Sequence, residues 1–343
     1  MLRFVAPAGA PVRISQILRS VRGLFSHDGK AREAIQALAG ALNARHVFAI
    51  SSGRAALSLI LKSLLRLRPD HSVVALPAYT CFTVPAAIVR TGLKLHPVDI
   101  DPMTLDFNFA QLSALPNEKT LCVLTSNLFG LVNNAARVRE IARAHGAFVV
   151  DDAAQALGST LHGLRAGLLG DVGFYSFGRG KALAAIEGGL IVTNSDEIAA
   201  AMAEEGSDLP RASAGHSAGL FLQLLVYAVF LRPRLYWIPN SLPFLKLGAT
   251  EFDPNFPSHQ LPALLGELLP QLMEQLETIN RIRRENAAAL TSALEGNPAF
   301  TVPRPAEGCS PNYIRFPLIA CDQTRRDRAV KALRSVGIGA GPF

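Results

Sequence analysis

The sequence predicts an α/β protein in which a mainly parallel sheet lies between two layers of helices, followed by a smaller C-terminal α+β domain. Two observations lead to this prediction. Short apolar runs alternate with stretches of helical periodicity, as in strands joined by covering helices. Polar side chains also follow directly after several of these runs, and in a parallel sheet such positions collect at one edge, where ligands bind.

The composition describes a globular protein with a full core. The chain has 343 residues, of which 49% are hydrophobic and 18% charged, enough for one large or two ordinary domains. Its net charge is +7, but the arginines are spread along the chain and form no basic stripe with aromatic residues. We therefore expect no nucleic-acid partner. A basic protein that handles phosphorylated small molecules accounts for the charge equally well.

The spacing of the cysteines and the sequence of the N-terminus both bear on the cellular compartment of the protein. Cys81, Cys122, Cys309 and Cys321 lie far apart, without the paired spacing of a metal site or a disulfide framework. The N-terminus lacks the positive start and the continuous apolar core of a signal peptide. These features predict no metal site, a reducing environment and residence in the cytoplasm.

The first predicted unit is a strand, a turn and a helix. Residues 1–29 are expected to form an irregular leader with a short amphipathic piece around 14–24, and a helix follows from Gly29 to Asn43. A strand at His46–Ile50 then runs into Ser51-Ser-Gly-Arg and a long helix. Such a turn leaves backbone N–H groups free for a phosphate, although Ser51 or Ser52 would serve equally as a plain N-cap.

The same pattern repeats along the chain. We expect further strands at Ser72–Leu76, Leu93–Val98, Thr120–Thr125 and Ala147–Val150, and helices at Val84–Thr91, Ala135–His145 and Asp196–Glu205. Asp151 and Asp152 follow the last of these strands directly. Because a buried carboxylate is costly without a partner, each of them needs one. One can cap the next helix, and the other can pair with a cationic nitrogen of a ligand.

Lys181 lies in a short glycine-bearing loop between two apolar runs, one around Phe174 and one at 190–193. Apolar runs bounded by glycines predict buried strands, so Lys181 is expected on a connection between two of them. Apolar neighbours lower the pKa of a lysine and make it a nucleophile, including as a Schiff base with pyridoxal phosphate. The alternative is an ordinary surface lysine.

The second half of the chain is less regular. A loop is expected at 206–219, then an apolar helix at Leu220–Leu231, which is too short for the roughly 20 residues that span a bilayer. We expect it to be buried or interfacial, with docking of residues 220–248 on a membrane surface as the alternative. A long amphipathic helix at Leu261–Leu294, a strand at Asn312–Ile319 and a helix at Arg325–Val336 complete the prediction.

Together these residues resemble the DegT/DnrJ/StrS family of pyridoxal-phosphate-dependent sugar aminotransferases, of aspartate-aminotransferase fold type I. The resemblance runs from about Ala49 to Thr193 and more loosely to the end of the chain. The motifs that carry it are Ser51-Ser-Gly-Arg-Ala-Ala-Leu, Pro77-Ala-Tyr-Thr, Val98-Asp-Ile-Asp-Pro102, Asp151-Asp-Ala-Ala-Gln-Ala-Leu-Gly158, Gly170-Asp-Val-Gly-Phe-Tyr-Ser-Phe177 and Glu187-Gly-Gly189.

The resemblance implies a role for each of these positions. Lys181 stands where the family keeps its Schiff-base lysine, Asp152 would pair with the pyridine nitrogen, and Gln155 would lie near the ring hydroxyl. The cofactor phosphate would be held by Ser52, Gly53, Arg54 and Ser176, and by Asn255 reaching the phosphate of a partner subunit. Either Phe82 covers the ring through a shifted loop, or Cys81 leaves the ring less covered.

The sequence also departs from the family pattern. Arg54 stands where threonine is common, and Cys81 occupies the place of the stacking aromatic residue, with Phe82 one position later. The family's Asn-x-Arg is reduced to Asn255-Phe-Pro257, without the arginine. The chain also stops where the family continues with a substrate loop, so part of the substrate site is unaccounted for.

The expected function is transfer of an amino group from an amino acid, glutamate by resemblance, to a nucleotide-linked keto-sugar in polysaccharide or amino-sugar biosynthesis, by a homodimer. The alternatives are a degenerate or regulatory relative, a pyridoxal-phosphate-dependent sugar dehydratase, whose members replace the lysine with histidine, and a cofactor-free α/β binding protein. The expected organisation is a leader at 1–29, a cofactor domain at 30–215, an apolar insertion at 216–254 and a small C-terminal domain at 255–343.

Overall fold

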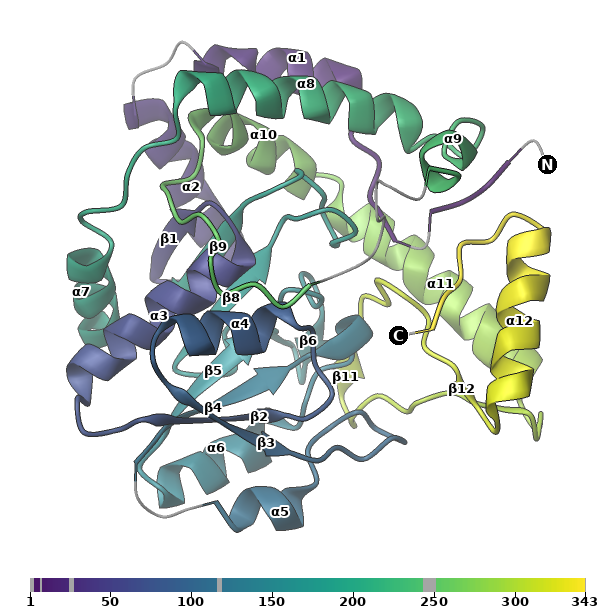
Figure 1. The fold of residues 1–343 in the computed structure, drawn as a ribbon, viewed down its shortest axis with the longest axis horizontal. Coiled ribbons are helices and arrows are strands. Elements are labelled where there is room, and N and C mark those ends of the chain that lie inside the picture. Colours follow the sequence, from purple (N-terminus) through teal and green to yellow (C-terminus); the bar gives the residue numbers. More distant parts are fainter. Residues whose placement is uncertain (1–2, 7, 25–27, 116–118, 243–250, 343) are drawn as a thin grey trace.

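The computed structural model describes residues 3–342 except 7, 25–27, 116–118 and 243–250. Its centre is a seven-stranded sheet in the order β1-β9-β8-β5-β4-β2-β3, in which β9 alone runs antiparallel to its neighbours (Figure 1). The strands are β1 (His46–Ile50), β2 (Val73–Pro77), β3 (Lys94–Val98), β4 (Thr120–Ser126), β5 (Phe148–Asp152), β8 (Val172–Ser176) and β9 (Gly189–Thr193). A mainly parallel sheet in an α/β fold is confirmed.

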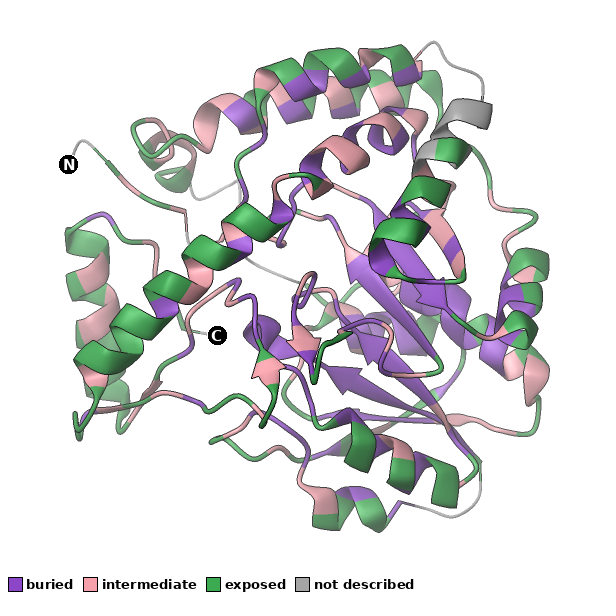
Figure 2. Cartoon of the chain, turned by 180° about the vertical axis from the view of Figure 1, so that it is seen from behind, coloured by how far each residue is buried: buried purple, intermediate pink, exposed green. Residues whose placement is uncertain are grey.

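Helices cover both faces of this sheet, as the alternation of side chains along β9 shows. Ile191 belongs to the core under α3 (Gly53–Leu67), α4 (Thr83–Arg90) and α7 (Asp196–Glu205). Leu190 and Val192 point the other way, into the core shared with α2 (Asp28–Leu42) and α10 (Ala263–Met273). Near β3, the short α5 (Phe109–Ser113) and α6 (Ala135–Ala144) enclose a separate small core. The strands between these layers are largely buried (Figure 2).

The C-terminal part is built from helices and short strands beside the main sheet. Helix α11 (Leu276–Leu294) leads to α12 (Gln323–Ser335), and β10 (Phe300–Thr301) pairs with β12 (Ile319–Ala320). Strand β11 (Cys309–Ser310) instead joins β6 (Thr160–Leu161) and β7 (Leu164–Arg165), close to the central sheet. The division into four segments stays a prediction.

The leader and the apolar segment lie together along one edge of the molecule (Figure 1). The leader forms α1 (Ile14–Ser20) and the 3₁₀ turn η1 (Val21–Leu24), as expected for 14–24. The apolar segment forms α8 (Ala214–Phe230) and the short α9 (Trp237–Asn240). Among the described residues, no helix is both long and apolar enough to cross a membrane.

Three local predictions are wrong. The loop at 206–219 ends early, because the side chain of Ser213 accepts a hydrogen bond from the backbone N–H of His216 and starts α8 at Ala214. The helix at Leu261–Leu294 is two helices, α10 and α11, separated at 274–275 after a turn that contains Pro270.

The third error is the strand at Asn312–Ile319, most of which lies in a loop. The side-chain amide of Asn312 donates to the backbone carbonyls of Gln155 and Leu157, each at 3.0 Å, and its backbone N–H donates to the Ser159 hydroxyl at 2.9 Å. These contacts bind the segment across the central loops instead of along a strand.

Candidate active site

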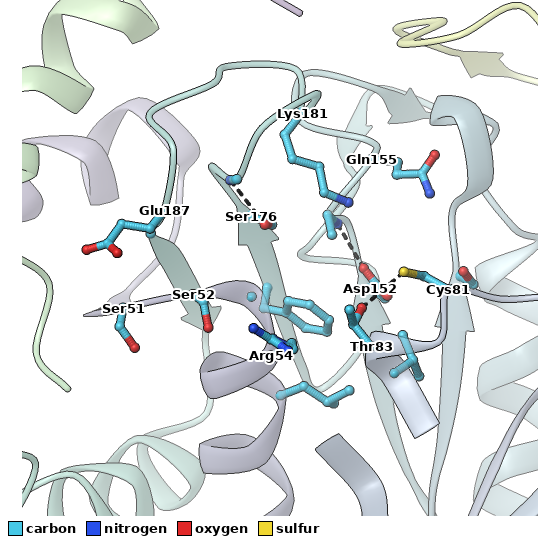
Figure 3. Close-up of a pocket in the computed structure, with 18 of the residues that line it drawn as sticks. Ser51, Ser52, Arg54, Cys81, Thr83, Asp152, Gln155, Ser176, Lys181 and Glu187 are labelled. Carbon is cyan, nitrogen blue, oxygen red and sulfur yellow. Dashed lines mark hydrogen bonds between the residues drawn. The ribbon is translucent and has the colours of Figure 1, made fainter. Parts of the chain in front are cut away.

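A cavity of about 320 Å³ opens at the carboxyl edge of the sheet, where β1, β4, β5 and β8 end (Figure 3). The sequence predicted nine site residues, and seven of them line this one cavity: Ser52, Gly53, Arg54, Asp152, Gln155, Ser176 and Lys181. They come from three separate parts of the chain, residues 52–54, 152–155 and 176–181. The fold therefore brings the predicted half-site together, as expected for ligand-binding residues at the ends of parallel strands.

One wall of the cavity is the N-terminus of α3. Ser52 caps the helix, since its hydroxyl accepts a hydrogen bond from the backbone N–H of Ala55 at 3.2 Å. A Cβ on Gly53 would lie 2.9 Å from the Cβ of Ser176, so a residue without a side chain is needed for α3 to approach β8 so closely. The helix end and the Ser176 hydroxyl thus face the same space, an arrangement suited to an anion.

The two adjacent carboxylates at the end of β5 have different environments. Asp151 is 2% exposed and accepts four hydrogen bonds, from the Thr125 hydroxyl, the Asn127 amide and the backbone N–H groups of Gly167 and Leu169. Its oxygens are fully used within the protein. We conclude that Asp151 is a structural anchor.

Asp152 keeps a carboxylate directed at the cavity. It is 7% exposed and accepts one hydrogen bond, from the backbone N–H of Ala154 at 2.9 Å. Burial raises the pKa of Asp152 to about 6, against the opposing effects of that hydrogen bond and of the nearby Lys181 amine. A group with this pKa is largely ionised at neutral pH and available to a cationic partner.

Lys181 approaches Asp152 from the connection between β8 and β9, and its side chain points into the cavity (Figure 3). Burial lowers the pKa of the Lys181 amine, while the charge of Asp152 acts in the opposite direction. A lysine in such surroundings is a better nucleophile and base than an exposed one. The expectation that Lys181 lies between two buried strands is confirmed.

Gln155 and Asn127 complete the floor of the cavity. The side-chain oxygen of Gln155 accepts a hydrogen bond from the backbone N–H of Phe129 at 3.1 Å, which fixes its orientation. Asn127 was not among the predicted site residues, although it directly follows β4 and lines the cavity. Its position directly after a buried strand is the feature of the sequence that could have identified it as a site residue.

Two predicted site residues lie outside the cavity in the single chain. Phe82 is 60% exposed and precedes α4, whereas Cys81 lines the cavity and accepts a hydrogen bond from the Thr83 hydroxyl at 3.1 Å. Asn255 is also exposed and does not line the cavity. In this structure Cys81, and not Phe82, faces the space where a planar ring would be covered.

The rim holds a cluster that the sequence did not predict. Glu187 and His259 line the cavity, and Glu187 shares a 2.8 Å hydrogen bond with His216 at the start of α8. Polar side-chain atoms of the three residues lie within 4.8 Å of one another. No sequence motif marks His259, because its position depends on the pairing of its segment with the end of β1, through hydrogen bonds to Ser51 in both directions.

Arg54 lines the cavity and is held by an aromatic contact. Its guanidinium lies 4.9 Å from the ring centroid of the buried Phe256, and Arg90 lies 4.2 Å from the same ring. Arg90 also donates to the backbone carbonyl of Phe256. The two cation–π contacts fix the segment that carries Asn255 and Pro257 against the cavity wall.

The fold and the site together define the class of the protein. A seven-stranded sheet with one antiparallel strand, and a lysine on the connection to that strand, is the architecture of the pyridoxal-phosphate-dependent transferases of fold type I. The chain is similar over 98% of its length to an E. coli GDP-4-keto-6-deoxy-D-mannose-3-dehydratase with bound hydrated PLP, of which it covers 84%, with a TM-score of 0.74 and 19% identity. At this identity the similarity establishes the fold.

The family follows from the sequence comparison. The model of the DegT/DnrJ/EryC1/StrS aminotransferase family matches residues 13–208, more than half of the chain. The chain belongs to this family, whose members depend on pyridoxal phosphate, and the resemblance inferred from its motifs is confirmed.

Curated relatives match the chain over a similar region. The "Pleiotropic regulatory protein" of Geobacillus stearothermophilus is 34% identical over 187 residues, 54% of this chain and 49% of the relative. The GDP-perosamine synthase of Caulobacter vibrioides is 33% identical over 167 residues, 49% of this chain and 44% of the relative. The matched region of the chain thus spans about half the length of each of these curated relatives.

Proposed function

We propose that the chain is a pyridoxal-phosphate-dependent aminotransferase that moves an amino group from an amino acid, glutamate in the first instance, to a nucleotide-linked keto-sugar for polysaccharide or amino-sugar biosynthesis. One observation supports this above all others. A lysine amine of lowered pKa and a buried, ionisable carboxylate meet in one cavity, beside a helix N-terminus suited to phosphate.

The cavity fits this cofactor. The close approach of Gly53 to Ser176 leaves a cradle with backbone N–H groups and a hydroxyl, the donors that a dianionic phosphate requires. Asp152 lies across the cavity and would hold a protonated ring nitrogen. When bound, pyridoxal phosphate supplies an electron sink for charge that develops next to the ring.

The side chains that line the cavity have separate roles in the proposed reaction. Lys181 would hold the cofactor through its amine, and the same amine would serve as the general acid and base that moves protons at the reacting carbon. Asp152 keeps a positive charge opposite its carboxylate. Gln155, fixed by the Phe129 backbone, orients the ring, and Ser52, Gly53, Arg54 and Ser176 hold the phosphate end.

The acceptor is proposed on chemical and comparative grounds. The cavity is lined by Arg54, whose positive charge suits an anionic substrate such as a nucleoside diphosphate sugar. A relative with 33% identity is a GDP-perosamine synthase, which is consistent with this substrate class.

The test begins with the cofactor. Purified protein incubated with pyridoxal phosphate should show a visible absorbance band, and borohydride should attach the cofactor irreversibly to the peptide that contains Lys181. Lys181→Ala should abolish both signals, while Arg179→Ala, in the same loop but exposed, should keep them. A wild-type protein that remains colourless with excess cofactor would contradict the proposal.

A second candidate is a family member that binds the cofactor without catalysing transfer. It is favoured by Cys81 facing the ring position, by Pro257 in place of arginine, and by a relative named "Pleiotropic regulatory protein". A panel of nucleotide keto-sugars with glutamate separates the two. Cofactor attachment without any aminated product across the panel supports this second candidate, and release of an unaminated deoxy-sugar would instead indicate a dehydratase.

We also propose that the active form is a cytoplasmic homodimer. Asn255 is exposed and outside the cavity of its own chain, so it can reach a cofactor phosphate only in a second copy. Sedimentation at micromolar concentration should give a dimer. Asn255→Ala should weaken cofactor binding without changing the fold, and a monomer that binds the cofactor fully would contradict the proposal.

A further inference from the structure

The leader and the apolar insertion form one layer at the edge of the molecule, which we call the leader–insertion layer (residues 3–24 and 209–242). Helices α1 and α8 are in contact and lie side by side (Figure 1). The backbone N–H of Phe4 donates to the carbonyl of Pro233 at 2.7 Å, and the rings of Phe4 and Tyr236 stack with centroids 6.0 Å apart. The two segments, distant in sequence, are therefore a single surface.

Helix α8 has no polar outer face. Its buried stripe is Leu220, Leu224 and Ala228, at a spacing of four residues. On the opposite side Leu222 is 62% exposed and Val226 is 49% exposed. A surface helix normally carries polar residues on that side, and a helix that is apolar all round is normally covered on all sides. Within the described part of the single chain, no segment covers the outer side of α8 at Leu222 and Val226.

Exposed apolar side chains also occur on the elements next to α8. Leu18 on α1 and Trp237 on α9 are 54% and 49% exposed, and Leu242 is 38% exposed. Trp237 is the single tryptophan of the chain. Large aromatic side chains with a polar edge favour the boundary between water and lipid headgroups.

The charge of these segments has one sign. Residues 1–27 and 209–250 contain eight of the 34 Lys and Arg residues and no Asp or Glu. The rest of the chain therefore holds 26 basic residues against all 27 acidic ones, so the whole positive excess of the protein lies in these two segments. The arginines are spread along the sequence, but the acidic residues that would balance them are missing here.

Four of these arginines are available to a partner. Arg19, Arg22, Arg232 and Arg234 are exposed, and within the described part of the chain none of them takes part in an ion pair. The layer thus combines exposed leucine, valine and tryptophan side chains with exposed arginines from segments that contain no acidic residue. This composition is typical of a surface that rests in the headgroup region of an anionic bilayer.

We propose that the leader–insertion layer is a docking surface for an anionic phospholipid membrane, with α8 lying in the plane of the interface. A second copy of this chain is the other candidate occupant. Symmetric contact between two such layers would bring arginines together with no acidic residue between them, which is unfavourable. Anionic headgroups supply the missing negative charge.

The experiment uses the full chain loaded with pyridoxal phosphate, and vesicles of phosphatidylcholine alone or mixed with phosphatidylglycerol. The protein should co-sediment with the mixed vesicles only, and less at high salt. The fluorescence of Trp237 should shift to shorter wavelength and be quenched by lipids brominated in their acyl chains. Binding to both vesicle types equally, or to neither, overturns the proposal.

Paired variants identify the surface. Arg232→Gln with Arg234→Gln should weaken binding to mixed vesicles by on the order of tenfold or more, as expected for two basic residues near an anionic surface. Leu222→Gln with Val226→Gln should do the same through the loss of apolar contact. The control, Arg328→Gln with Lys331→Gln on the exposed α12, removes the same charge elsewhere and should leave binding unchanged.

Two outcomes of the variants contradict the proposal. An equal loss of binding in the α12 control would mean that net charge alone attracts the protein. A change of the sedimentation coefficient in the Leu222 and Val226 variant without lipid, combined with no vesicle binding by the wild type, would assign the layer to a second copy.

Discussion

The charged side chains of the cavity and those of the leader–insertion layer differ in their burial and in their partners. In the cavity, Asp151 and Asp152 are buried, and Asp151 is satisfied by four hydrogen bonds from the protein. In the layer, Arg232 and Arg234 are exposed, and no acidic residue occurs in residues 209–250. In the cavity, protein hydrogen bonds satisfy Asp151 and leave one buried carboxylate, Asp152, facing a ligand, whereas in the layer the exposed arginines have no acidic residue within their own segment. A site for chemistry and a surface for attachment can be told apart on this basis.

The largest effect is expected from the charge that faces the cavity. Asp152→Asn removes the carboxylate but keeps the shape, so the protein should fold while transfer activity falls by about 10²–10³-fold, the usual cost of removing one preorganised electrostatic group. Steady-state kinetics on a nucleotide keto-sugar measures it. Full activity of the variant would refute the proposed role of the Asp152 carboxylate in the reaction.

The neighbouring carboxylate should show the reverse behaviour. Asp151→Asn directs an amide N–H₂ group at donors, among them the backbone N–H groups of Gly167 and Leu169. The free energy of unfolding should fall by about 2–4 kcal/mol because buried donors lose their acceptor. Urea denaturation followed by circular dichroism tests this, and an unchanged midpoint would refute the role of anchor.

The buried state of Asp152 also predicts a pH dependence in the cofactor-free protein. Its pKa is raised from 3.8 to about 6, so the folded state binds this proton more tightly than the unfolded chain does. Through this group, stability should rise by at most about 3 kcal/mol as the pH falls from 7 to about 4, and be lost again as the pH rises through 6. Urea denaturation at several pH values across this range gives the free energy of unfolding of the wild type and of Asp152→Asn. The difference between the two isolates the contribution of Asp152. A constant difference would contradict the shifted pKa.

The smallest effect is expected on the outer side of α8. Leu222→Gln should change the free energy of unfolding by no more than about 0.5 kcal/mol, because the side chain is 62% exposed. Leu224→Gln, two residues further along the same helix, should cost about 3 kcal/mol because Leu224 is fully buried. If the two variants were equally damaging, the outer side of α8 would be part of the fold and not a docking surface.

The sequence predicted the central sheet and its strand ends because local patterns determine them. The strands at His46–Ile50 and Thr120–Ser126 contain the continuous apolar runs 47–50 and 121–124, and the polar residues after such runs meet at one edge of a parallel sheet. The same reasoning located Asp152 and Lys181. Asp152 is the last residue of β5 and Lys181 lies five residues after the end of β8, so the fold leaves little freedom in where they lie.

What the sequence could not predict depends on contacts between distant segments. Asn312 is bound to the carbonyls of Gln155 and Leu157, and these hydrogen bonds override the strand propensity of its own segment. His259 reaches the rim because its backbone pairs with Ser51, over two hundred residues earlier. The outward position of Phe82 follows from its place immediately before α4, a helix boundary that local sequence leaves uncertain.

The hydrogen bond between His216 and Glu187 joins the first turn of α8 to the rim of the cavity. A ligand that displaced Glu187 would strain or break this contact, and a partner that displaced the start of α8 would act on the rim through the same contact. Thermodynamic linkage makes such an exchange reciprocal: the factor by which a cavity ligand changes the affinity of the layer for its partner equals the factor by which that partner changes the affinity for the ligand. If the layer docks as proposed, this hydrogen bond would couple membrane attachment to ligand binding in the cavity.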